Sequence, residues 1–160
     1  MLAICLASVL FLTMACGMLG NLVGGDATAV TALWKDVPKL EDATRLDTEM
    51  PAAIKVVMNA ALGGKFDFVA YKSSASPEQV KAFYSVERMQ ALGWAADSAG
   101  CNNIAAQADG GADLAGGLCT FSKTEEGKQG VLLIVLGKTE SGAETRLFYA
   151  RAILPPTPKP

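Results

Sequence analysis

The sequence contains no histidine among its 160 residues. Histidine is the commonest general base and zinc ligand, so its absence excludes a Ser-His-Asp triad and argues against a zinc centre. An excess of one charge is also lacking, because 14 Lys and Arg residues face 16 Asp and Glu residues, for a net charge of −2. Such a chain has no basic surface for nucleic acid, and no nucleic-acid partner is expected.

Charge is absent from the first 25 residues, which are mostly Leu, Ala, Met, Val and Gly. Leu2 to Ala15 form an apolar run of the length of a signal-peptide core. The run continues less densely to Val23, which makes it long enough to cross a bilayer as a helix. Two interpretations of residues 2–23 therefore stay open: a leader that is cleaved, or an apolar helix that remains in the membrane.

The residues around Cys16 favour cleavage. "TMAC" (13–16) resembles the lipobox of bacterial lipoproteins, in which the cysteine thiol receives a diacylglyceryl group and the leader is cut before it. Thr13 stands where Leu is usual, and no Lys or Arg precedes the run, so the uncleaved anchor remains the alternative. We expect residues 1–16 to be a signal peptide with a lipobox-like end and Cys16 to be the lipidation site.

The four cysteines support export independently. Cys5 and Cys16 belong to the leader, which leaves Cys101 and Cys119 in the globular part. An even pair in an exported domain is most simply a disulfide, which here stabilises the fold by roughly 3 kcal/mol in the chain-entropy model. A redox or metal pair fits poorly, because the two cysteines are far apart and no histidine is present.

The rest of the chain is punctuated by clear secondary-structure signals. The run from Pro51 to Gly64 has helical apolar spacing and ends at glycine. "SPEQVKAFYSVERMQALGW" (76–94) begins with a capping box and ends in Gly-Trp, which predicts one long helix with a Schellman close. The continuous apolar run 131–136 predicts a central strand covered on both faces. That strand is predicted over 130–138, and further strands are predicted over 44–46, 65–73, 118–123 and 144–154.

These elements predict an α+β fold. We expect a four- to five-stranded, mainly antiparallel sheet with two helices packed on one face, preceded by the N-terminal apolar helix. Residues 17–33 are predicted to be a flexible spacer, 34–154 a single α+β domain, and 155–160 a Pro-rich tail.

Two stretches carry a resemblance. "VPKLEDAT" (37–44) and the helix 76–94, with its "SP-x-x-V-x-x-F-Y" start and "G-W" end, resemble uncharacterised small bacterial lipoprotein domains. The resemblance covers roughly residues 36–153. It implies a fold, and it brings no activity and no catalytic residues.

The sequence contains few residue clusters of a kind that supports catalysis or metal binding. Ser-Lys pairs occur at 72–74 and at 122–123, but adjacent strand residues point to opposite faces. The neighbouring acids at 41–42 and 125–126 are interpreted as solvated loop charges. "DGGAD" (109–113) lacks the ligand density of a calcium loop. No catalytic residue, metal site or cofactor is predicted, and the chain is not expected to be an enzyme.

The function that these observations favour is a tethered one. We expect a membrane-anchored lipoprotein on the extracytoplasmic side of a bacterial cell envelope, acting as a non-catalytic binding or accessory domain. The alternative is a single-pass membrane subunit of a larger envelope complex, with residues 2–23 uncleaved. Both interpretations make the membrane a partner, through the N-terminal lipid or helix, and both are compatible with a protein partner in the envelope.

Overall fold

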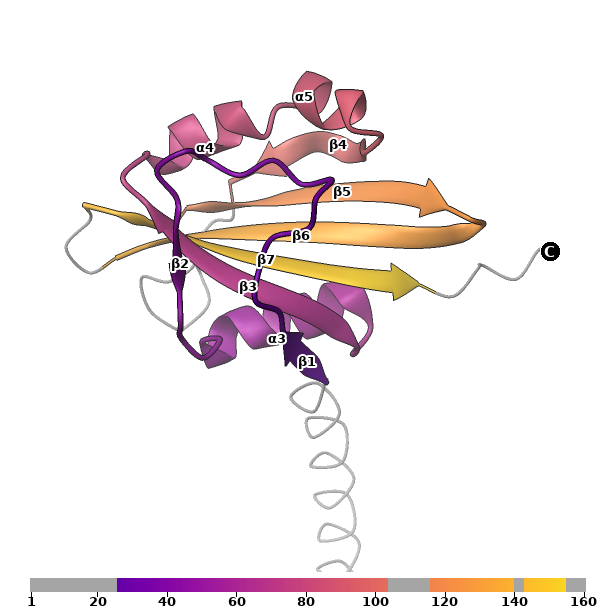
Figure 1. The fold of residues 1–160 in the computed structure, drawn as a ribbon, viewed down its shortest axis with the longest axis horizontal. Helices are drawn as coiled ribbons and strands as arrows, with labels where there is room; N and C mark the ends of the chain where they lie inside the picture. Colours follow the sequence, from indigo (N-terminus) through magenta and orange to yellow (C-terminus); the bar gives the residue numbers. More distant parts are fainter. Residues whose placement is uncertain (1–25, 104–115, 140–142, 155–160) are drawn as a thin grey trace, which may run out of the picture.

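The computed structural model describes residues 26–103, 116–139 and 143–154. The predicted leader (1–16), the following residues up to 25 and the tail (155–160) lie outside the described residues. Within the described part, seven strands form one sheet in the order β1-β3-β7-β6-β5-β4, and β2 also pairs with β3 (Figure 1). The strands are β1 (Ala27–Ala29), β2 (Thr44–Leu46), β3 (Phe66–Ser73), β4 (Ala95–Asn102), β5 (Gly117–Glu125), β6 (Lys128–Lys138) and β7 (Thr145–Leu154).

The sheet is mainly antiparallel, as predicted, with one parallel pair between β1 and β3. It is larger than the four or five strands expected, because β1 and β4 were not predicted. β1 is only three residues long, and β4 is built of small and polar residues without the β-branched side chains typical of strands. β6 is buried from Gly130 to Gly137, which confirms a central strand covered on both faces.

The first helix forms where its pattern predicts. α3 (Ala52–Leu62) follows Pro51 and ends at Gly63, whose φ of 75° is the left-handed conformation that glycine adopts without strain. Ile54 and Met58 from its apolar stripe are fully buried.

The second predicted helix is divided in two. α4 (Pro77–Phe83) has the expected capping box at its start. α5 (Val86–Ala91) begins anew because Ser85, in an extended conformation, caps it by accepting a hydrogen bond from its backbone. The amide of Trp94 then donates to the carbonyl of Met89 at 3.0 Å, which confirms the predicted Schellman close.

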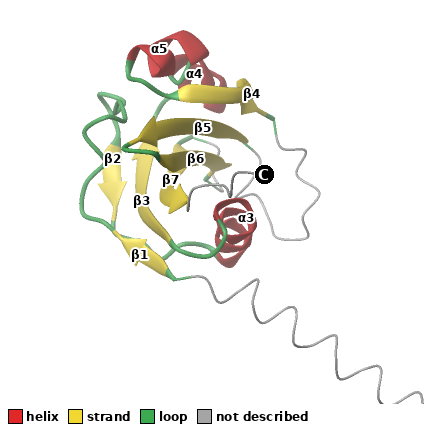
Figure 2. Cartoon of the chain, turned by 90° about the vertical axis from the view of Figure 1, so that its right-hand side faces the viewer, coloured by secondary structure: helices red, strands yellow, loops and turns green. Residues whose placement is uncertain are grey.

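The helices lie on opposite faces of the sheet, which corrects the expectation that they share one. α3 packs with the odd-numbered residues of β6, such as Leu133, whereas α4 and α5 belong to the cluster that contains Leu132 and Ile134 (Figure 2). The physical reason lies in β6 itself. Successive strand residues point to opposite faces, so an unbroken apolar strand needs cover on both sides.

An irregular segment, residues 30–43, completes the cover on the face of α4 and α5. This segment, which we call the strap, crosses the front of the sheet in Figure 1 and buries Val37, Leu40 and Ala43. Residues 26–33, predicted as the end of a flexible spacer, are therefore part of the fold. Their backbone is bound to β3, where the amide of Val30 donates to the carbonyl of Phe68 at 2.8 Å.

Candidate functional site

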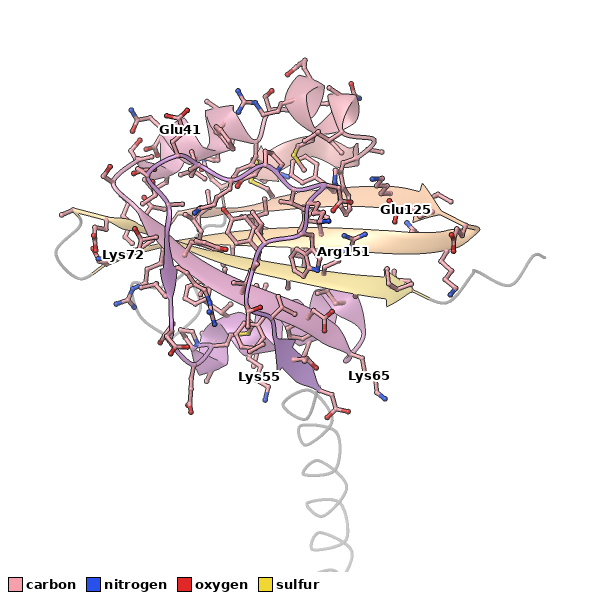
Figure 3. The ribbon with its side chains drawn as sticks, in the orientation of Figure 1. Glu41, Lys55, Lys65, Lys72, Glu125 and Arg151 are labelled. Carbon is pink, nitrogen blue, oxygen red and sulfur yellow. A yellow bond between two sulfur atoms is a disulfide. The ribbon has the colours of Figure 1, made fainter. Side chains whose placement is uncertain are left out.

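A compact charge network holds the strap against the sheet. Lys123 of β5 and Arg151 of β7 project from the same face and both reach Asp36 of the strap. The nitrogen-oxygen distances are 3.2 Å from Lys123 Nζ and 3.0 Å from Arg151 Nη1. Glu125 closes the network, 2.8 Å from Lys123 and 3.4 Å from Arg151, and Figure 3 shows it beside Arg151.

Both tryptophans of the chain lie against this network. The guanidinium of Arg151 lies 5.3 Å from the ring centre of Trp94 and 5.9 Å from that of Trp34, within the range of a cation–π contact. The indole nitrogen of buried Trp94 donates to the backbone carbonyl of Asp36 at 2.9 Å. The pKa of Lys123 is raised, chiefly by its hydrogen bond to Glu125 and further by Asp36, although burial opposes this.

Two buried tyrosines hold the strap from beneath. The hydroxyl of Tyr84 donates to the carbonyl of Pro38 at 2.7 Å and lies 2.8 Å from the hydroxyl of Tyr149. A carbonyl oxygen only accepts hydrogen bonds, so the single hydroxyl proton of Tyr84 is donated to Pro38. In the contact between the two tyrosines, Tyr149 is therefore the donor and Tyr84 the acceptor. Burial raises the pKa of both phenols, so they act as neutral hydrogen-bonding groups.

The serine-lysine pairs do not assemble into catalytic dyads. The hydroxyls of Ser73 and Ser74 donate to Asp42, at 2.9 Å and 2.7 Å, and Lys72 pairs with Glu144 at 3.0 Å. The pKa of Asp42 is lowered, mainly by the Ser74 hydroxyl and then by that of Ser73. Asp42 is therefore an anchored acceptor rather than the merely solvated charge that the sequence suggested.

The other predicted pairs can be placed as follows. Lys123, adjacent to Ser122, is engaged by Asp36 and Glu125, so Glu125 also has partners beyond solvent. The 109–113 stretch lies outside the described residues. Among those described, no group of three or more Cys, Asp and Glu side chains is placed to hold a metal ion.

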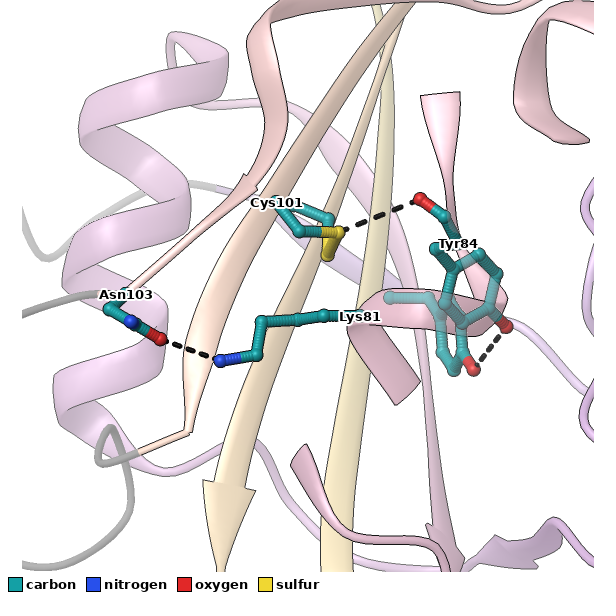
Figure 4. Close-up of a disulfide and its surroundings, with 6 residues drawn as sticks. Lys81, Tyr84, Cys101 and Asn103 are labelled. Atoms are coloured by element: carbon teal, nitrogen blue, oxygen red, sulfur yellow. Dashed lines mark hydrogen bonds between the residues drawn. A yellow bond between two sulfur atoms is a disulfide. The ribbon is translucent and has the colours of Figure 1, made fainter. Parts of the chain in front are cut away.

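The predicted disulfide between Cys101 and Cys119 is confirmed. The two residues oppose each other in the β4–β5 register with their Cα atoms 3.9 Å apart (Figure 4). The Cys101 sulfur lies 3.7 Å from the carbonyl oxygen of Tyr84, and since a disulfide sulfur has no proton this is a packing contact. Nearby, Lys81 of α4 donates to Asn103 at 2.6 Å, which ties that helix to the end of β4.

A hollow of about 930 Å³ is lined by residues in or beside β1, β3 and β7. Trp34 and Arg151 form one wall of this hollow and connect it to the charge network. Lys55 and Lys65, which Figure 3 shows at the lower edge of the domain, also line the hollow. No sequence pattern predicts this site, because its residues come from five separate segments and share no spacing.

The predicted lipidation site, Cys16, lies outside the described residues. Over residues 26–103, 116–139 and 143–154, no helix has the length and apolar character needed to cross a membrane. Comparison with protein-family models, with curated proteins and with solved structures gave no match to this chain.

Proposed function

We propose that this chain is a lipid-anchored domain on the extracytoplasmic side of a bacterial envelope, which binds a ligand or partner without catalysing a reaction. The observation that carries the proposal is the Cys101–Cys119 disulfide. Disulfides persist in oxidising compartments, and export to such a compartment is what an apolar leader ending at Cys16 achieves.

The charged and hydroxyl side chains support a binding role. The candidate serines donate to Asp42, and Lys123 and Arg151 are held between two carboxylates. These hydrogen bonds and ion pairs stabilise the fold. A catalytic serine would instead need a neighbouring base that accepts its proton. The hollow beside Trp34 offers an open surface that a ligand can reach.

The N-terminal peptide of protein isolated from native-host membranes tests the proposal directly. We expect a peptide that begins at Cys16 and carries added acyl mass. Cys16→Ser abolishes that mass and detaches the domain or blocks its processing, while Cys5→Ser is the matched control and changes neither. A peptide that begins at Met1 with an unmodified Cys16 identifies the uncleaved membrane subunit instead and refutes lipidation.

The disulfide provides a separate check on location. Alkylation of freshly isolated protein, followed by mass measurement, is expected to leave Cys101 and Cys119 unlabelled unless a reductant is added. Free thiols at both positions in the native host contradict an extracytoplasmic location.

A further inference from the structure

We propose that the hollow beside Trp34 binds a short extended peptide that carries both a positive and a negative group and pairs its backbone with the free edge of β7. This inference rests on the proposed binding function and names its ligand class. Three observations on the described residues carry it: a strand edge without a neighbouring strand, charges of both signs without an ion-pair partner, and an exposed isoleucine beside a half-buried tryptophan.

Among the described strands, the two neighbours of β7 stop at different points, which leaves part of one edge of β7 without a partner. Toward its C-terminal end, β7 pairs with β6 up to Leu154 but with β3 only up to Arg151. No described strand therefore pairs with the β3-facing edge of β7 beyond Arg151, and Ala152 and Ile153 line the hollow there. The backbone groups of an open edge are a template for an added strand.

The walls of the hollow carry two acids and two lysines. Asp26 directly precedes β1, and Asp67 lies in β3. Lys55 lies in α3, and Lys65 directly precedes β3. Within the described residues, none of the four forms an ion pair. A ligand with a single sign of charge meets repulsion from one pair, while a ligand with both signs finds a partner for each.

Apolar contacts complete the site. Ile153 is 55% exposed, the largest exposure among the large hydrophobic side chains of the described residues, and Trp34 lines the same hollow. In strand addition, backbone hydrogen bonds give affinity and side-chain contacts give selectivity, so this combination suits a peptide better than an isolated ion.

The first test uses tetra-alanine with free ends, whose extended length of about 13 Å spans the open part of the edge. The isotope-labelled full chain in detergent is titrated and followed by NMR. We expect shifts at the amides of Ala152–Leu154 and at the Trp34 indole. Blocking both peptide ends is expected to weaken binding about fivefold, because two exposed charge pairs are lost. N-methylation of the central amides is expected to abolish it.

Substitutions that remove charge but keep a polar side chain test whether the charges bind the peptide, independently of any effect on folding. Asp67→Asn with Lys65→Gln should weaken tetra-alanine binding as end-blocking does, while Glu87→Gln, at an exposed position of α5, leaves it unchanged. Unaltered chemical shifts elsewhere verify that each variant is folded. Equal binding of the N-methylated peptide, equal binding of maltotetraose, or no shift at about 10 mM peptide, a weak-binding limit, overturns the inference. None of these results depends on the Cys16 lipid, so failure here is distinct from failure of the anchoring proposal.

Discussion

Replacing Asp36 by Asn is expected to loosen the strap at its most connected point. The substitution keeps the side-chain shape but removes the charge that Lys123 and Arg151 share. Their side chains are 19% and 15% exposed, and that of Asp36 is 25% exposed, so the network is neither a surface pair nor a fully buried one. Surface pairs contribute about 0–1 kcal/mol and breaking buried ones costs about 3–5 kcal/mol, which places the expected loss near 2 kcal/mol.

Urea unfolding of the full chain in detergent, followed by tryptophan fluorescence, measures this loss. The signal reports on the right place because the chain has two tryptophans and both lie beside the network. In thermal unfolding, the same loss of ~2 kcal/mol corresponds to a fall in Tm of about 4–8 °C.

Asp47→Asn is the matched control for this measurement. Its side chain is fully exposed and lies 3.7 Å from Arg45, so a change below about 0.5 kcal/mol is expected. Molar salt should erase any effect at Asp47 and leave most of the effect at Asp36, because partly buried pairs are screened less. Equal effects of the two substitutions refute the idea that the network holds the strap.

Three further predictions concern other parts of the fold. Gly116→Ala places a methyl group 2.6 Å from a β6 carbonyl oxygen, and in urea unfolding it should lower the free energy of unfolding by about 1–3 kcal/mol. Gly130→Ala is the control, because the nearest atom to its added methyl group is 3.5 Å away; it should leave the free energy of unfolding unchanged or raise it by up to about 1 kcal/mol. Tyr84→Phe leaves the Pro38 carbonyl and the Tyr149 hydroxyl buried without their hydrogen-bond partner, so it should lower the free energy of unfolding by about 1–3 kcal/mol. Tyr149→Phe keeps the hydrogen bond from Tyr84 to the strap and should cost less; equal costs contradict the assigned hydrogen-bond directions. The lowered pKa of Asp42 means that its stabilisation is present above the unfolded value of 3.8 and is lost as pH falls through the folded pKa, so wild type and Asp42→Asn should converge in stability at low pH, and a gap that persists there argues against this role.

Local signals account for the elements that the sequence predicted correctly. The capping box at Ser76, the glycine at 63 and the apolar run of β6 each act over a few residues, so they can be identified without a fold. The break between α4 and α5 has a local cause too, since Ser85 is an N-cap residue. It was obscured because the apolar spacing continues across the break.

The sequence by itself determined the α+β class, the central strand, both ends of α3, the start of α4, the close of α5 and the disulfide partners, because each depends on spacing or on a count. Only the tertiary structure decided which face each helix covers and where β1 and β4 add to the sheet. It alone brought Asp36, Lys123 and Arg151 together. The physical reason is separation along the chain: pairing of distant strands sets these contacts, and no local pattern encodes which distant residues will meet.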